Sequence, residues 1–168
     1  MLKDHKHIEI WIREHTSKEF TIHPDGAVDV RGNVSLRWDG ATLPVQFGRI
    51  EGSFNVNDST LTSIVGFPHY VQTVMYCSRT NIRSLHGIEE AVKYVGDTFF
   101  CTGKLPTHML GLLLIEGITN VRIDDVNEKG ESNEVLQRIL NKHIGGNGDI
   151  LVCQDELIDA GFIDQARW

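Results

Sequence analysis

The sequence predicts an α+β protein built around a short parallel β-solenoid of about five coils. The first observation is a recurring strand core in which an apolar residue, any residue and a second apolar residue follow one another. The second is the spacing of these cores, whose steps are 20, 21, 24 and 22 residues. Periods of this length are typical of solenoids. The five cores begin at Val34, Phe54, Met75, Phe99 and Val121.

A third observation is that neighbouring coils repeat a local phrase. Leu61-Thr62-Ser63-Ile64 in one coil corresponds to Ile82-Arg83-Ser84-Leu85 in the next. Alternation of period two puts both apolar residues of a core on one face of a short strand, and stacked coils bury that face. Unrelated antiparallel strands are the alternative, and the near-constant step disfavours them.

The N-terminal residues 1–27 are expected to cap the first coil. Residues 4–16 have the pattern of an amphipathic helix, because Ile8, Trp11 and Ile12 fall at i, i+3 and i+4, and Asp4 is suited to be its N-cap. Pro24-Asp25-Gly26 then predicts the turn of a β-hairpin that leads into the solenoid at residues 28–125.

Residues 126–168 are expected to form a helical cap on the other end, within one structural domain overall. One helix is predicted from Ser132 or Asn133 to about Lys142, and a second from about Asp149 to Ala160, with Gly161 as its C′ residue. The apolar positions of the two helices are Val135, Leu136, Ile139 and Leu140, followed by Ile150, Leu151, Leu157 and Ile158.

Composition narrows the function classes. The formal net charge of −7 argues against direct binding to a nucleic acid, which needs clustered Lys and Arg. Three cysteines, no apolar leader and no apolar run of membrane-spanning length predict reduced thiols and a cytoplasmic location, with no membrane association.

The strand face opposite the core is the predicted binding surface, because solenoids commonly bind partners on such an extended sheet. Tyr76 and Phe100 are expected to be neighbouring exposed aromatic residues on it, and Tyr and Arg are favoured interface anchors. The alternative is that the terminal helices or a homo-oligomer contact cover this face. The predicted partner-binding residues are Ser35, Arg37, Asn55, Asn57, Tyr76, Ser78, Phe100, Thr102, Arg122 and Asp124.

Other candidate sites favour ordinary structural roles. Cys77 and Cys101 occupy equivalent inward positions within disulfide reach, but buried reduced thiols of raised pKa are the favoured interpretation. His5-x-His7 lacks further ligands at zinc spacing, and the glycine-rich residues 145–149 lack the Lys of a phosphate loop. With no catalytic motif present, we expect a non-catalytic protein without a cofactor or bound metal.

The repeat phrases resemble the degenerate leucine-rich-repeat-like proteins that tailed bacteriophages encode. The residues that fit are Phe54, Val56, Leu61, Thr62, Ser63, Gly66 and Pro68 in one coil, and Cys77, Ile82, Ser84, Leu85 and Gly87 in the next. The C-terminal stretch 153–162 also resembles the cap of those proteins, whereas the fourth coil departs from the pattern after Leu105. The resemblance implies a leucine-rich-repeat-like solenoid with helix–hairpin and helical caps.

The expected function is therefore binding of a protein partner through the strand face. The resemblance further implies a phage accessory protein that acts on a host or defence protein in the host cytoplasm. Three alternatives stay open: a virion or assembly component, an enzyme, and an acidic mimic of nucleic acid that inhibits a DNA-binding protein. The last depends on an acidic cluster made of Asp124, Asp125, Glu128, Glu131 and Glu134.

Overall fold

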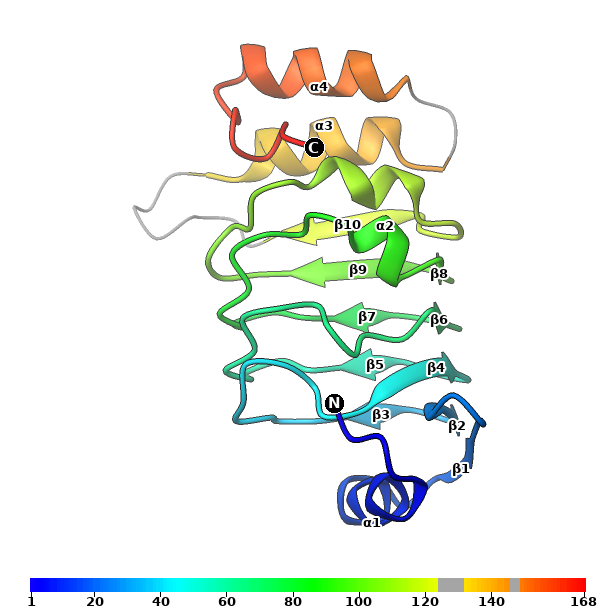
Figure 1. Ribbon diagram of the computed structural model, residues 1–168. Coiled ribbons are helices and arrows are strands. Elements are labelled where there is room, and N and C mark those ends of the chain that lie inside the picture. The colour runs from blue at the N-terminus through cyan, green and yellow to red at the C-terminus, as the bar shows by residue number, and fades with distance from the viewer. Residues whose placement is uncertain (124–131, 146–148) are drawn as a thin grey trace.

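The computed structural model describes residues 1–123, 132–145 and 149–168. It is a parallel β-solenoid of about five coils with one helix at the N-terminal end and two at the C-terminal end, which confirms the predicted fold class (Figure 1). The five predicted strand cores form one parallel sheet, called sheet 2 below. Its strands are β3 (Val34–Ser35), β5 (Phe54–Asn55), β7 (Met75–Tyr76), β9 (Thr98–Cys101) and β10 (Asn120–Ile123).

A second sheet, called sheet 1, forms the opposite wall of the coils and was not predicted beyond its hairpin. Its inward residues Val30, Ile50, Val71 and Val95 pair in register and follow one another by 20, 21 and 24 residues, the same steps that separate the first four strand cores. Its strands are β1 (Glu19–Ile22), β2 (Ala27–Arg31), β4 (Gln46–Ile50), β6 (Tyr70–Val71) and β8 (Tyr94–Val95).

The core lies between the two sheets. Phe47 of sheet 1, Phe54 of sheet 2 and Phe67 of a connecting loop meet edge to face, with ring centroids 5.6 and 5.7 Å apart. All three are fully buried, so each buries about 150–250 Å² of side-chain surface. The short helix α2 (Ile88–Ala91) and the 3₁₀ helix η1 (Leu110–Leu114) replace extended chain in the later return loops.

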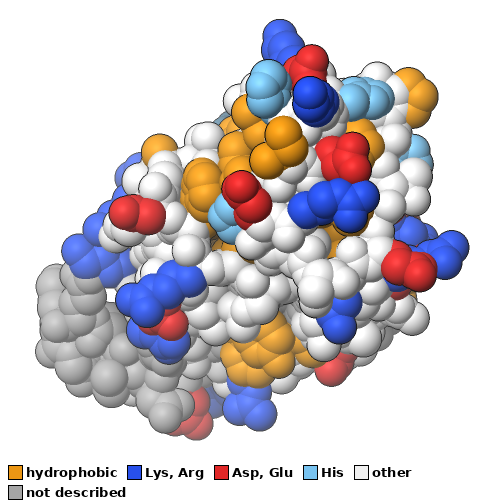
Figure 2. All heavy atoms as spheres, turned by 90° about the horizontal axis from the view of Figure 1, so that it is seen from below, with side chains coloured by type: hydrophobic (Ala, Val, Ile, Leu, Met, Phe, Trp, Pro, Cys, Tyr) orange, Lys and Arg blue, Asp and Glu red, His pale blue; other side chains and the backbone are white. Residues whose placement is uncertain are grey.

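The N-terminal cap matches its prediction. Helix α1 (His5–His15) begins at Asp4, whose carboxylate accepts hydrogen bonds from the backbone amides of Lys6 and His7, and it buries Ile8, Trp11 and Ile12. The hairpin β1–β2 is antiparallel, with Gly26 at φ 86° in its turn. Seen from this end, a group of apolar side chains remains at the surface among charged and histidine side chains (Figure 2).

The C-terminal cap consists of α3 (Glu134–His143) and α4 (Ile150–Asp159). Helix α3 covers the open edge of β10: the Asn141 side chain accepts from the Val121 amide at 2.6 Å and donates to the Val121 carbonyl at 3.0 Å, and Gln137 accepts from the Ile123 amide. Helix α4 packs on α3 and forms the far end of the molecule (Figure 1).

Gly161 at φ 87° ends α4, as predicted. The amide of Gly161 bonds to the Ile158 carbonyl and that of Phe162 to the Leu157 carbonyl, which is the Schellman arrangement. No helix within the described ranges is long and apolar enough to span a membrane.

Candidate functional site

The outward residues of sheet 2 form one straight column. The parallel register pairs Ser35 with Asn55, Asn55 with Tyr76, Tyr76 with Phe100 and Phe100 with Arg122. Ser35 and Arg122 are exposed, and the three residues between them are half-buried. The structure therefore brings the predicted central column together, because the apolar residues on either side of each member are anchored in the core.

Tyr76 and Phe100 stack at the centre of this column. Their ring centroids are 4.8 Å apart and their planes differ by 17°. The separation matches the spacing of neighbouring strands, so the parallel register itself sets the two rings face to face. Each ring covers one face of the other, and the exposed remainder forms a rigid aromatic surface.

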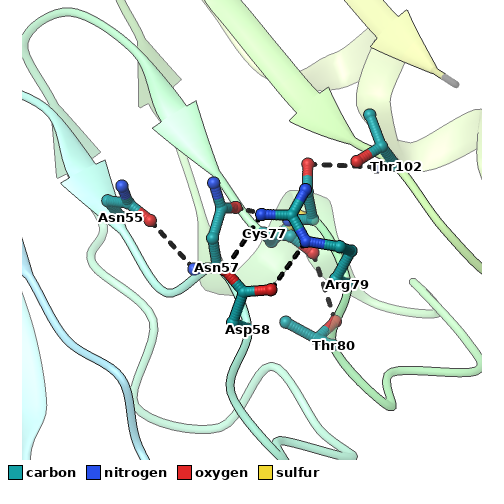
Figure 3. A network of polar contacts seen from close by, with 8 residues as sticks. Asn55, Asn57, Asp58, Cys77, Arg79, Thr80 and Thr102 are labelled. Atoms are coloured by element: carbon teal, nitrogen blue, oxygen red, sulfur yellow. Dashed lines mark hydrogen bonds and ion pairs between the residues drawn. The ribbon is translucent and has the colours of Figure 1, made fainter.

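A ladder of polar groups flanks the column at the carboxyl ends of the strands (Figure 3). Asn55 accepts from the Asn57 amide at 2.9 Å, Asn57 accepts from the Ser78 amide at 2.7 Å, and the Ser78 hydroxyl accepts from the Thr102 amide at 3.1 Å. The bonds at Ser78 and Thr102 tie successive coils together where the regular strands have already ended, and the Asn55–Asn57 bond lies within one coil. The side chains that make them are committed to the fold.

The ladder corrects one predicted binding residue. Ser78 was expected to point outward, but it is only 3% exposed, because its hydroxyl turns in to satisfy the Thr102 backbone. Asn57 and Thr102 are half-buried, and Arg37 is exposed. Asp124 lies outside the described residues, as do Asp125, Glu128 and Glu131 of the acidic cluster, whose remaining member Glu134 is exposed at the start of α3.

Asp58 and Arg79 form an ion pair beside the ladder, which the sequence analysis missed. The Arg79 guanidinium donates from Nε and Nη2 to the two carboxylate oxygens at 2.6 and 2.9 Å, and it lowers the pKa of Asp58 (Figure 3). Both residues have positive φ, 58° and 53°, and Gly103 follows at 102°. Asp58, Arg79 and Gly103 follow one another by 21 and 24 residues, the same steps that separate the strand cores. This shared spacing is the sequence feature that places the three residues at equivalent positions of successive coils.

A second aromatic ladder lies on sheet 1. Tyr70 and Tyr94 stack with centroids 4.5 Å apart, and the Arg49 guanidinium lies 3.7 Å over the other face of Tyr70. Gly117 lies close against the Tyr94 ring, since a Cβ placed on this glycine would be 2.7 Å from Tyr94 Cε2. Tyr70 and Tyr94 are half-buried, as are Tyr76 and Phe100, so this stack is a matched counterpart on the other sheet.

A groove of about 840 Å³ lies beside β1 and is lined mainly by residues of α1, β1 and β2. Its arginines are paired, Arg13 with Glu9 and Arg31 with Glu19. Among the described groups with a shifted pKa, Asp58 lies beside sheet 2 and Glu156 on α4. His23 adjoins the groove, and its pKa is raised by a hydrogen bond with Asp29, which lines the groove, and by the nearby Asp29 charge.

Histidines gather in the return loops without forming a metal centre. The rings of His86 and His108 are 5.3 Å apart, and His108 Nδ1 lies 3.0 Å from the Ser84 hydroxyl and 2.7 Å from the Thr107 hydroxyl. His69 bonds to the Ala91 carbonyl. Within residues 1–123, 132–145 and 149–168, no three His, Cys, Asp or Glu side chains are grouped to hold a metal ion.

The cysteines are free and buried. The Cys77 thiol lies 3.3 Å from the Phe100 carbonyl, and its pKa is raised by a hydrogen bond with Cys101 and by burial. Burial raises the pKa of Cys153 to about 11. The predicted raised pKa of an inward thiol is confirmed for Cys77. Cys77 and Cys153 therefore lack the lowered pKa of a nucleophilic cysteine.

We expect Cys153, as the sole thiol in a Cys77→Ala/Cys101→Ala variant, to react with a disulfide reagent at about pH 8 roughly 100-fold more slowly in the native state than after unfolding. Its pKa of about 11 is two units above the ordinary 9.0, and only the thiolate attacks. The measurement is the rate of thiolate release in buffer and in denaturant. Equal rates in the two states would contradict the burial described here.

The fold and the outer face of sheet 2 together define the chain as a small parallel β-solenoid with helical caps and an exposed sheet surface. No family model, no curated protein and no solved structure matches the chain. The likeness to phage leucine-rich-repeat-like proteins therefore stays a prediction from the sequence.

Proposed function

We propose that the protein is a non-catalytic binding module that holds a protein partner against the outer face of sheet 2. The observation that carries this proposal is the Tyr76–Phe100 stack, half-exposed at the centre of the column with ring centroids 4.8 Å apart. Aromatic residues supply large, rigid contact area at an interface, and they are frequent energetic hot spots.

Preorganisation supports this choice of surface. The backbone under the column is held by the sheet, and the backbone beside it by the Asn57 and Ser78 side chains. A surface that is already ordered loses little conformational entropy on association. Arg37 and Arg122 extend from the same face as exposed cations, and arginine is the other residue type enriched at hot spots.

The class of partner is proposed from the sequence resemblance. A phage accessory protein of this kind would bind a host or defence protein inside the host cell. The face could also be covered by a second copy of the chain, which measurement of the solution mass distinguishes from a heterologous partner.

The test is affinity capture of a tagged chain from host lysate, followed by titration of the captured protein against variants. We expect Tyr76→Ala/Phe100→Ala to weaken binding at least tenfold, because it removes both central anchors. Tyr70→Ala/Tyr94→Ala is the matched control, since it deletes an equivalent stack on sheet 1. Unchanged affinity in the first variant, with both variants folded, would refute the proposal.

A further inference from the structure

Helix α4 exposes apolar side chains at the far end of the molecule. Its inner face buries Cys153 and Leu157 completely, whereas Leu151 and Ile158 on an adjacent side are 63% and 44% exposed, and Val152, farther round the helix, is 45% exposed. In Figure 1, α3 lies between α4 and the solenoid, and no described helix or strand is drawn beyond α4. This helix is therefore apolar on two sides and packed on one.

Exposed apolar residues are concentrated in this cap. Ten large hydrophobic side chains are exposed among the described residues, and six of them lie in its short sequence. Single exposed hydrophobics scattered over a surface are ordinary, but a group of them marks an interaction site. The six are Val135, Leu151, Val152, Ile158, Ile163 and Trp168.

The charges on α4 give the second, independent observation. The helix contains no Lys, Arg or His, and its last turn has no basic residue. Asp155 and Asp159 are exposed in its C-terminal half, where the negative end of the helix dipole disfavours carboxylates. Glu156 differs, because it turns toward α3 and its pKa is lowered by a hydrogen bond from Lys142 and, less, by His143, whose Nε2 lies 3.3 Å from a carboxylate oxygen.

We propose that the outer face of α4 docks a basic amphipathic helix of a partner protein. The apolar side of such a helix would cover Leu151 and Ile158, which lie seven residues apart on one side of α4 with Asp155 and Asp159 along one edge. Its flanking Lys or Arg residues would neutralise Asp155 and Asp159, and so relieve both unfavourable features at once. The proposal does not depend on the function assigned to sheet 2.

A second copy of α4 fits this face poorly. In an antiparallel pair that matches Leu151 with Ile158 of the other copy, the two-fold axis passes near Asp155 and sets two carboxylates against each other. An anionic lipid surface meets the same repulsion from Asp155 and Asp159. Charge complementarity therefore selects a basic protein segment.

The test uses two synthetic helical peptides that share leucines on one face and differ in their flanking residues, lysine in one and glutamate in the other. Each is titrated into the isotopically labelled chain, and backbone amide shifts give both the affinity and the location of binding. We expect the lysine peptide to bind at least tenfold more tightly than the glutamate peptide, with the largest shifts along α4.

Variants separate docking from a structural role. Leu151→Ser/Ile158→Ser is expected to bind the lysine peptide at least tenfold more weakly, while its melting temperature stays unchanged. Asp155→Asn/Asp159→Asn is expected to bind the lysine peptide at least tenfold more weakly. Its melting temperature stays equal or rises, because two carboxylates are removed from the negative end of the helix dipole. Ile10→Ser on α1, also an exposed apolar site at 47%, is the matched control and keeps full affinity.

Each contrary result overturns the proposal. These are no binding of the lysine peptide at millimolar concentration, equal binding of the two peptides, or shifts that map outside α4. A chain whose solution mass doubles, and returns to that of a monomer in Leu151→Ser/Ile158→Ser, would assign the face to a second copy instead. Binding of the chain to anionic vesicles through the same residues would assign it to a lipid surface.

Discussion

Replacing Gly96 by alanine is expected to lower the free energy of unfolding by about 3 kcal/mol, the range typical of overpacking against a rigid neighbour. Gly96 follows β8, and its amide donates to the Val71 carbonyl at 3.0 Å. A Cβ at this position would collide with the Gln72 carbonyl oxygen of the preceding coil. Backbone atoms cannot rotate away as a flexible side chain can, so two stacked coils would have to separate locally.

The measurement is urea unfolding followed by circular dichroism, with Gly87→Ala as the matched control. Gly87 has φ 74° but open space around its missing Cβ, so its substitution costs only backbone strain of about 1 kcal/mol. If Gly96→Ala lowers the free energy of unfolding no more than Gly87→Ala does, the two coils are not in such close contact at Gly96.

Replacing Asn141 by leucine is expected to cost about 2–4 kcal/mol, because it leaves two buried backbone groups unsatisfied. The Asn141 amide bonds to both the amide and the carbonyl of Val121, and so it occupies the place of a sixth strand at the edge of β10. Val121 is fully buried, so water does not replace the lost partner. Leucine has the same branching and number of heavy atoms as asparagine, and its methyl groups offer neither a donor nor an acceptor to Val121.

Gln137→Leu provides a graded comparison in the same unfolding experiment. Gln137 satisfies only one backbone group, the Ile123 amide at 2.9 Å, so we expect about half the loss. Arg138→Ala, on the exposed side of α3, should change the free energy of unfolding by less than about 0.5 kcal/mol. A neutral Asn141→Leu would mean that α3 covers the edge without capping it.

Much of the fold follows from local sequence. Apolar pairs at a constant step require a stacked core, and Asp4 and Gly161 mark helix ends through their own side-chain and backbone chemistry. Beyond its hairpin, sheet 1 escaped prediction because strands such as β6 and β8 each bury a single apolar residue, Val71 and Val95, and so show no alternating apolar pair. The strands of sheet 1 are indicated only by the 20-, 21- and 24-residue steps between their inward residues, which equal the steps between the strand cores of sheet 2.

The candidate site divides in the same way. The column from Ser35 to Arg122 follows from the register of the strand cores, which a parallel ladder allows little freedom to shift. Ser78 could not be placed correctly, because the strand ends before it and its hydroxyl finds the Thr102 amide, 24 residues away. Asp58 and Arg79 likewise pair across coils, where no local pattern connects them.

The sequence alone determined the repeating core, the two caps and the line of residues on the outer face of sheet 2, because these depend on periodicity and on neighbouring residues. Tertiary structure decided which polar groups join coils and which apolar groups stay exposed. In α4 the pattern offers apolar residues on more than one side, and contact with α3 and η1 selects Cys153 and Leu157 for burial. None of the described elements covers Leu151 and Ile158, which stay 63% and 44% exposed.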